Sequence, residues 1–224
     1  MAAIVAALLL RYLYHQHVQK ERELGASRAR FQALQARIRP HFLFNSMNTI
    51  AHLTRADPVL AEEVVQDLAD LFRAALADGE RLSTLEAELA LARQYLRIEG
   101  QRLGSRLQVV WDLEDLPADA RVPGLILQPL IENAVYHGIE PAPAGGTITV
   151  AGRYRRHRVN LSVRNTLGAP SGQAHRPGNR MAVDNLRDRL LARYGDEATL
   201  TVAEVDGEYQ VRLTFPHPFA EGDQ

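Results

Sequence analysis

The chain has 224 residues, of which 46% are hydrophobic and 24% are charged, and its formal net charge is −1. This length suits one large or two small globular domains, and the composition excludes a disordered or collagen-like chain. The absence of cysteine excludes disulfides, thiol nucleophiles and cysteine-based metal sites. Lys20 is the only lysine and follows no glycine-rich loop, which excludes a G-x-x-x-x-G-K-[ST] phosphate-binding loop. The near-neutral charge argues against a general nucleic-acid-binding protein.

An unbroken apolar run, Ala2 to Leu10, lies at the N-terminal end. It is shorter than the roughly 20 residues that span a bilayer, and no basic leader precedes it. Aromatic and then basic residues follow between positions 11 and 22, as at the cytoplasmic end of a membrane helix. We therefore expect residues 1–23 to be the end of a membrane segment and a linker. A buried or frayed N-terminal helix is the alternative.

Residues 24–104 are predicted to be helical. Asp57 and Pro58 interrupt this region, because Asp as N-cap and Pro at the first helical position begin a new helix. The apolar stripe of that helix consists of Val64, Leu68, Leu71 and Ala75. Ser83-x-x-Glu86 is a capping box that begins a third helix. We expect the first two helices to form an antiparallel hairpin, whose stripe packs in a four-helix bundle across two chains.

Residues 105–224 mix strands and helices, which predicts an α+β domain after the helical region. The helices are expected at 123–137 and 181–194. The strands are expected at 107–113, 146–154, 159–163, 200–205 and 209–215. Asp206-Gly207 joins the last two strands as a hairpin turn.

The expected turn between the second and third strands is rich in arginine. The residues concerned are Arg153, Arg155, Arg156 and Arg158, beside Tyr154 and His157. Such a group can attract nucleic acid or anionic lipid, or it can be a solvated hairpin tip. The balanced overall charge favours the solvated tip.

Two helical segments carry side chains suited to chemistry. In the first, His41 and Asn45 are four residues apart and share a helix face, just after Pro40. An imidazole at this position could accept a phosphoryl group, or it could simply satisfy backbone groups at a proline bend, which the spacing alone favours.

The second segment runs from Leu127 to Gly138. Asn133 and His137 share one face, with Glu132 beside them. An Asn oxygen is a suitable ligand for a Mg²⁺ that also holds phosphates. The alternative is a polar helix end closed by Gly138 as C-cap, and the pattern alone does not decide between the two.

The segment from Leu34 to Phe215 resembles the cytoplasmic half of a LytS-type sensor histidine kinase. Pro40 to Asn45 matches the phosphoacceptor motif of that family, and Gln128 to Ala134 matches its asparagine box. Tyr95 to Glu99 and Asp184 to Leu190 match further family signatures. The resemblance implies a dimerising helical hairpin followed by a two-layer α/β sandwich ATPase domain of the gyrase/Hsp90/histidine-kinase/MutL fold.

The resemblance also implies roles for individual residues. His41 would be the phosphoacceptor, with Asn45 and Glu132 assisting catalysis, and Asn133 would bind Mg²⁺. The expected contacts to ATP come from Asn133, His137, Asn165, Gly178, Arg180 and Asn185.

Several positions depart from the family pattern. Asn165 stands where the family carries an Asp that accepts a hydrogen bond from adenine, so the bond should be weaker. In the second glycine box only Gly178 remains, and Arg180 could compensate by meeting the phosphates. Tyr136 replaces a residue that is often basic. Phe42 follows His41, so no adjacent carboxylate can act as a base.

Taken together, the resemblance implies a dimeric sensor histidine kinase in the bacterial inner membrane, with this part facing the cytoplasm. Residues 1–23 would be the membrane end and linker, 24–104 the dimerisation and phosphotransfer region, and 105–224 the catalytic domain. ATP and Mg²⁺ are the implied cofactors, and a LytTR-type response regulator is the implied partner. The alternatives are a degenerate kinase that acts as a docking scaffold or phosphatase, and a helical adaptor with an incidental ATPase-like domain.

Overall fold

The computed structural model describes residues 39–77, 82–167 and 177–219, and only the backbone of 177–182. The chain divides into two compact units, residues 1–44 and 45–224, and the packing described below lies in the second. The helices are α2 (Pro40–Ala56), α3 (Pro58–Leu76), α4 (Leu85–Leu103), α5 (Gln128–Asn133) and α6 (Pro177–Tyr194), with a π-helix η2 (Ala134–Ile139) and 3₁₀ turns η1 (Gly104–Arg106) and η3 (Gly195–Glu197). The strands are β1 (Leu82–Thr84), β2 (Leu107–Glu114), β3 (Arg121–Pro123), β4 (Gly146–Arg155), β5 (Arg158–Thr166), β6 (Thr199–Val205) and β7 (Glu208–Pro216).

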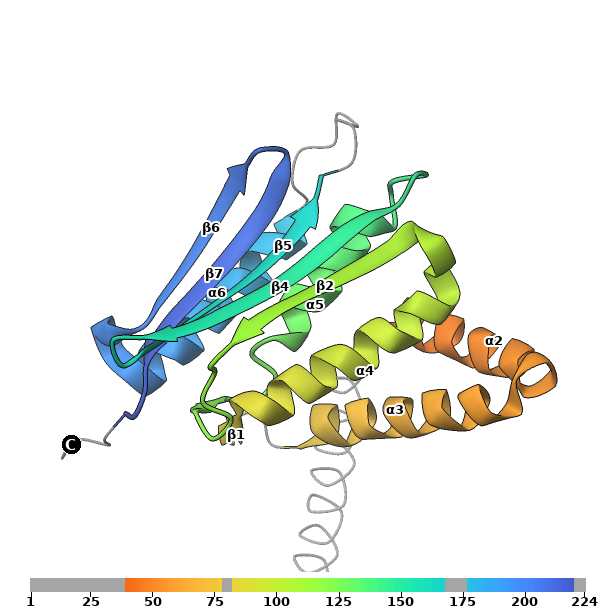
Figure 1. Ribbon diagram of the computed structural model, residues 1–224, viewed down its shortest axis with the longest axis horizontal. Coiled ribbons are helices and arrows are strands. Elements are labelled where there is room, and N and C mark those ends of the chain that lie inside the picture. The colour runs from red at the N-terminus through yellow and green to blue at the C-terminus, as the bar shows by residue number, and fades with distance from the viewer. Residues whose placement is uncertain (1–38, 78–81, 168–176, 220–224) are drawn as a thin grey trace, which may run out of the picture. The chain divides into compact units, whose positions relative to one another are not determined.

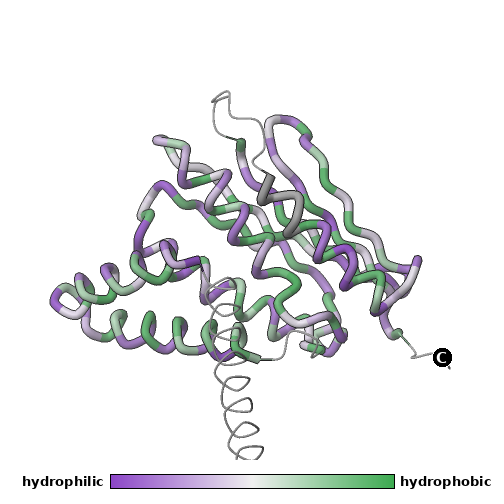
Figure 2. Tube along the Cα trace, turned by 180° about the vertical axis from the view of Figure 1, so that it is seen from behind, coloured by the Kyte–Doolittle hydropathy of each residue, from purple (hydrophilic) through white to green (hydrophobic). Residues whose placement is uncertain are grey.

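A five-stranded sheet in the order β2-β4-β5-β7-β6 is the centre of the second unit. The β2–β4 pair is parallel and the other pairs are antiparallel. Alternate residues are buried along the central strands, for example Val159, Leu161 and Val163. Figure 2 colours the chain by hydropathy and shows hydrophobic and hydrophilic segments alternating along the visible strands. The buried face is covered by α5, η2 and α6 (Figure 1). Helices before a mixed two-layer sandwich confirm the predicted fold class.

The apolar stripe of α3 packs inside the same chain, against α4. Val64 is fully buried and Leu68 is 4% exposed. Asp67, on the same face, pairs with Arg97 of α4, with 2.8 Å between Asp67 Oδ2 and Arg97 Nε. The expectation that this stripe faces a partner chain is therefore wrong, because α4 already covers it.

The starts of α3 and α4 are determined by side-chain caps. Asp57 caps α3 as predicted, since its Oδ1 accepts from Leu60 N at 3.1 Å. The cap of α4 is Thr84, whose Oγ1 accepts from Ala87 N at 3.2 Å, and not Ser83. The predicted capping box is wrong by one residue because α4 begins at Leu85, which makes Thr84 the N-cap and leaves Ser83 one residue too early.

The predicted helix 123–137 is shorter at its start and longer at its end. Pro123 ends β3, α5 begins at Gln128, and the helix continues as η2 to Ile139. Gly138 therefore lies inside η2, which excludes the alternative in which it closes the helix as a C-cap. The last helix begins at Pro177 instead of 181.

Both predicted hairpins form. The β4–β5 turn consists of Arg156 and His157, both at positive φ, and the β6–β7 turn consists of Asp206 and Gly207, also both at positive φ. These are the backbone conformations of the tight turns that match strand twist.

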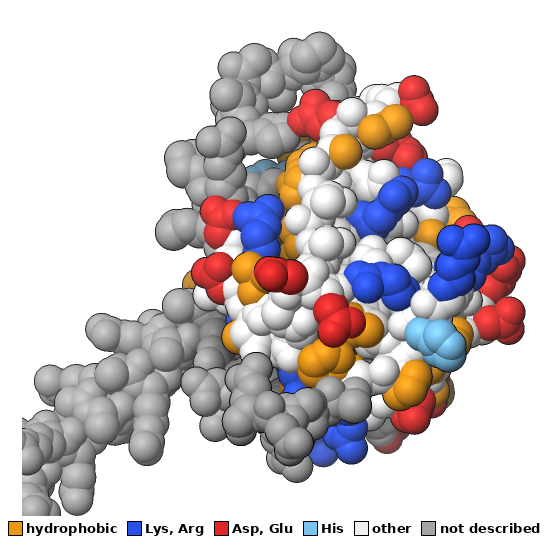
Figure 3. Space-filling model, turned by 90° about the vertical axis from the view of Figure 1, so that its left-hand side faces the viewer, with side chains coloured by type: hydrophobic (Ala, Val, Ile, Leu, Met, Phe, Trp, Pro, Cys, Tyr) orange, Lys and Arg blue, Asp and Glu red, His pale blue; other side chains and the backbone are white. Residues whose placement is uncertain are grey.

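The arginines of the β4–β5 hairpin are partly engaged with the domain itself. Arg153 Nη2 donates to both carboxylate oxygens of Asp112 at 2.9 Å, which ties β4 to β2. Arg158 donates to the backbone oxygen of Glu197, while Arg155 and Arg156 are exposed. The side of the molecule that bears edge strand β6 mixes basic and acidic side chains (Figure 3).

Across the three described stretches, none of the helices combines the length and the apolar character needed to cross a bilayer. The predicted membrane segment end at residues 1–23 lies outside the described residues.

Candidate functional site

The predicted phosphoacceptor segment forms the start of α2. Pro40 is its first helical residue, a position where the missing N–H costs nothing. His41 is exposed and Asn45 is half-buried one turn later. An exposed imidazole on a helix is accessible to a second domain or protein, as phosphoryl transfer requires. The expected bend at Pro40 would involve the residues before Arg39, which lie outside the described ranges.

The asparagine-box residues form α5 and the first residue of η2, and η2 packs against β4 and β5. Asn133 is 7% exposed. Gln128 Nε2 donates to Glu132 Oε1 at 3.0 Å, which orients that half-buried carboxylate. The rings of Tyr136 and His137 meet edge to face with centroids 4.8 Å apart, so His137 has a defined orientation beside Asn133.

Asn165 of β5 contacts the end of this helix. It lies near the end of β5 and is 3% exposed, and its Nδ2 donates to the backbone oxygen of Thr166 at 3.1 Å. A Cβ on Gly138 would lie only 2.3 Å from that Nδ2. Gly138 is therefore the point where η2 backbone and the Asn165 side chain meet. The fold therefore brings the end of the helix that bears the asparagine box against the predicted adenine-reading position.

The remaining predicted residues are on α6. Asn185 is exposed there, between Asp184 and the buried Leu186. Gly178 and Arg180 lie in the first turns of α6, and their side chains are outside the described part. Arg189 donates to Gly124 O and Tyr194 OH donates to Arg121 O, which ties α6 to the loop before α5.

A buried carboxylate of α4 holds the start of the asparagine-box helix. Glu88 is 2% exposed and accepts from Leu125 N at 2.8 Å, Ile126 N at 2.7 Å and Leu127 N at 3.3 Å. Burial raises the pKa of Glu88, and these backbone hydrogen bonds oppose the rise. The sequence prediction missed this role because the backbone groups that Glu88 holds lie nearly forty residues later in the chain.

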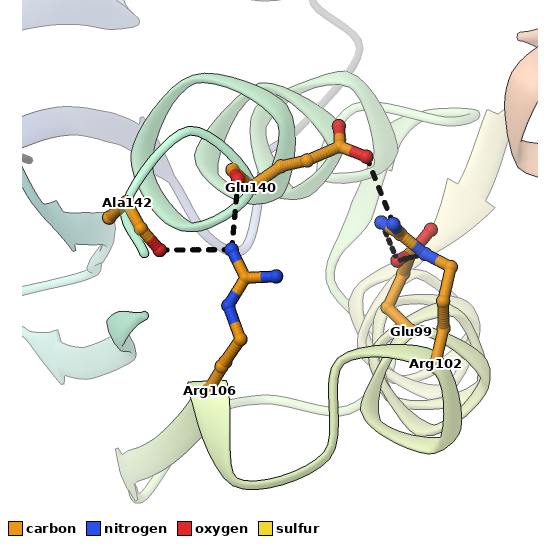
Figure 4. A network of polar contacts seen from close by, with 5 residues as sticks. All are labelled: Glu99, Arg102, Arg106, Glu140 and Ala142. Atoms are coloured by element: carbon orange, nitrogen blue, oxygen red, sulfur yellow. Dashed lines mark hydrogen bonds and ion pairs between the residues drawn. The ribbon is translucent and has the colours of Figure 1, made fainter. Parts of the chain in front are cut away.

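An ion-pair network holds the other end of the same helix (Figure 4). Arg102 Nη1 lies 2.9 Å from Glu140 Oε1, just after η2, and Arg102 Nε lies 2.8 Å from Glu99 Oε2. Arg106 Nη2 donates to the backbone oxygens of Glu140 at 3.0 Å and Ala142 at 2.9 Å. Burial lowers the pKa of Arg102, but Glu99 and Glu140 outweigh it and leave that pKa raised. Only Glu99 fell within a sequence motif.

The donor set suits a magnesium ion that arrives with a nucleotide. Within the described ranges, no three His, Cys, Asp or Glu side chains gather as a metal cluster. Asn133 offers an amide oxygen, and Mg²⁺ commonly takes one or two protein oxygens and completes its shell with water and phosphates. The missing Cβ of Gly138 leaves room for Asn165, whose amide oxygen can accept from an adenine amine.

Comparison with protein families finds one matching family model, which covers part of the chain. Residues 29–107 match the family model described as histidine kinase. The chain is 32% identical to the sensor histidine kinase YpdA of Escherichia coli over 205 residues, which cover 88% of this chain and 36% of YpdA. It is also 32% identical to the sensor protein LytS of Staphylococcus saprophyticus, covering 84% of this chain and 34% of that protein. The chain therefore spans about a third of the length of these relatives.

Solved structures with a similar arrangement include histidine kinases. The Acinetobacter baumannii histidine kinase AdeS matches with a TM-score of 0.47 at 12% identity, over 87% of this chain and 98% of that one. The histidine kinase domain of the Erythrobacter litoralis EL346 blue-light activated kinase matches with a TM-score of 0.44 at 16% identity, over 84% and 91%.

Proposed function

Because the chain carries a histidine kinase family segment and is homologous to LytS-type sensor kinases, we propose that it is the catalytic part of a two-component sensor histidine kinase. The observation that carries the proposal is the junction of Gly138 with Asn165. It places the helix bearing Asn133 and His137 against the strand that bears the predicted base-reading side chain. A separate helix presents an exposed His41.

In the proposed reaction, an imidazole nitrogen of His41 attacks the γ-phosphorus of ATP. The new N–P bond forms as the bond to the β–γ bridging oxygen breaks, ADP leaves, and the imidazole N–H proton passes to solvent. ATP supplies the phosphoryl group and Mg²⁺ offsets its charge. Asn133 would hold the metal, and Asn45 and Glu132 would assist at the two reacting segments. His137, Asn165, Gly178, Arg180 and Asn185 would contact the nucleotide.

The finer assignments extend this proposal. Residues 24–104 would dimerise and transfer phosphoryl groups, and 105–224 would bind ATP. The resemblance of the motifs to LytS-type kinases implies a LytTR-type response regulator as partner. It also implies attachment to the bacterial inner membrane through residues 1–23, with this part in the cytoplasm. The motifs also resemble those of AlgZ (FimS), the alginate and pilus regulator kinase, so the partner would be AlgR-like.

Radiolabelled ATP tests the proposal. The chain is incubated with Mg²⁺ and [γ-³²P]ATP, and the label is expected on His41, stable to alkali and labile to acid. Absence of label together with absence of calorimetric ATP binding at millimolar concentration would contradict the kinase function.

The neutral Asn165 favours one second candidate, a response-regulator docking scaffold or phosphatase that does not bind ATP. A charged acceptor is missing at this position, which weakens one expected nucleotide contact. This candidate predicts that the chain binds the unphosphorylated or phosphorylated regulator while showing no affinity for Mg·ATP.

A further inference from the structure

The asparagine-box helix is fastened at its start by one side chain of α4. Both carboxylate oxygens of Glu88 are used: Oε1 accepts from Leu125 N, and Oε2 accepts from Ile126 N and Leu127 N. Leu125 has a positive φ of 56°, which is unfavourable for a side chain of this type. The three hydrogen bonds therefore hold an otherwise costly backbone turn directly before α5.

The same helix is fastened at its end by a second side chain of α4. Arg102 reaches Glu140 with one guanidinium nitrogen while two others stay on Glu99 (Figure 4). Glu140 immediately follows η2. Its own backbone oxygen accepts from Arg106, so its position is determined through both side chain and main chain.

Asn133 lies between these two attachment points. We propose that α4 is a two-ended clamp on the α5–η2 helix, and that Glu88 and Arg102 are positioning residues for the nucleotide site. This inference rests on the proposed function for its nucleotide arm only, because the clamp itself is a statement about how firmly residues 128–140 are held.

The Arg102–Glu140 pair can be broken by substituting either residue, and the two substitutions differ in what else they disturb. Glu99 is 3% exposed, so loss of Arg102 would leave a buried carboxylate without its cation and would destabilise the fold. Glu140 is the better residue to substitute, because Glu140→Gln removes the charge of the Arg102–Glu140 ion pair and loosens the helix end while Arg102 and Glu99 remain paired.

Asp112→Asn is the matched control. Asp112 is likewise a half-buried carboxylate paired with an arginine, Arg153 at 2.9 Å, but that pair ties β2 to β4. Both variants lose one arginine–carboxylate ion pair, but only Glu140→Gln loosens the helix that bears Asn133.

Two measurements on the purified chain test the clamp. Hydrogen exchange without nucleotide is expected to quicken at amides 128–140 in Glu140→Gln and to stay at wild-type rates there in Asp112→Asn. Calorimetry with Mg·ATP is expected to show roughly three- to tenfold weaker binding for Glu140→Gln only. Glu140→Asp, which keeps the charge, is expected to recover part of the affinity.

Exchange that rises equally in both variants, or stays unchanged at 128–140 in Glu140→Gln, overturns the clamp. Unchanged ATP affinity in Glu140→Gln overturns its role in nucleotide positioning. If wild type neither binds Mg·ATP nor labels His41, the proposed function fails, and the exchange comparison still decides whether the clamp exists.

Discussion

Gly138 of η2 and Asn165 of β5 are in contact with no room for a side chain between them. A Cβ at position 138 would lie 2.3 Å from Asn165 Nδ2 and 2.8 Å from its Cγ. Helix backbone and strand side chain therefore share one small volume, and each restricts what the other position can hold.

Gly138→Ala is expected to lower the free energy of unfolding by about 1–3 kcal/mol, since an inserted methyl forces Asn165 aside. Mg·ATP binding should weaken with it. The control is Gly100→Ala in α4, where a Cβ would meet no described atom within 4 Å and should stabilise the helix by roughly 0.5–1 kcal/mol. Urea denaturation measures both. Equal stability of the two variants would show that Asn165 is not confined.

His41→Gln is expected to abolish phosphorylation and leave the fold unchanged. Gln has no nucleophilic ring nitrogen, while His41 is exposed and its replacement disturbs little packing. Incubation with [γ-³²P]ATP and circular dichroism measure the two properties. Label retained on the variant would mean that another residue accepts the phosphoryl group.

Asn165→Asp is expected to tighten Mg·ATP binding about fivefold, because a charged acceptor exceeds a neutral one by about 1 kcal/mol. Asn133→Ala should remove binding by deleting the magnesium ligand. Isothermal calorimetry gives both affinities. Asn165→Asp with unchanged or lower affinity would show that this position does not read adenine.

Two variants separate dimerisation from folding. Met47 on α2 is 50% exposed, and Phe44 one turn earlier is 69% exposed, so we expect this face of α2 to contribute to a dimer. Met47→Glu should halve the mass measured by light scattering with little effect on the melting temperature. Leu68→Glu should instead unfold the chain, because its charge would be buried against α4 at a cost of several kcal/mol. A Met47→Glu variant that stays dimeric places the interface elsewhere.

Glu88 predicts a pH dependence of stability. Burial raises its pKa in the folded state above the ordinary value of 4.5, so the folded protein binds this proton more tightly than the unfolded chain. The contribution of Glu88 to the free energy of unfolding is therefore greatest below about pH 4.5 and falls as pH rises through the raised pKa.

Urea denaturation of wild type and Glu88→Gln across this range isolates the effect, because other titrating groups are common to both proteins. The wild-type free energy of unfolding, taken relative to the variant, should decrease with increasing pH. A difference that is constant, or that grows with pH, would show that folding does not raise the pKa of Glu88.

Local patterns predicted the elements of this fold and failed where distant residues decide. The Asp57-Pro58 break and the Asp206-Gly207 turn depend on their own backbone preferences and are found as predicted. The cap of α4 is Thr84 and not Ser83, and the strand β1 directly before this helix pairs with β3, nearly forty residues later in the chain, which no local pattern indicates. A stripe of helical periodicity showed that α3 buries one face, but not that α4 covers it.

The candidate site shows the same division. Motifs identified Asn133 and His137, whose spacing is visible in one helix. The contacts that hold this helix could not be predicted from the sequence. Glu88 of α4 accepts from Ile126, and Arg102 of α4 pairs with Glu140, only in the folded protein. The sequence left open whether Gly138 closes the helix as a C-cap, because its contact with Asn165 exists only in the folded protein.

The pairing of α3 with α4 determines where this chain can be fused to another protein without exposing buried side chains. A foreign domain joined ahead of Pro40 would leave the two helices together and would keep His41 on α2. A junction between them would expose Val64 and Leu68 to water and remove the Asp67–Arg97 pair that joins the helices. Chimeras joined between α3 and α4 should be insoluble, whereas those joined ahead of Pro40 should keep α3 packed on α4.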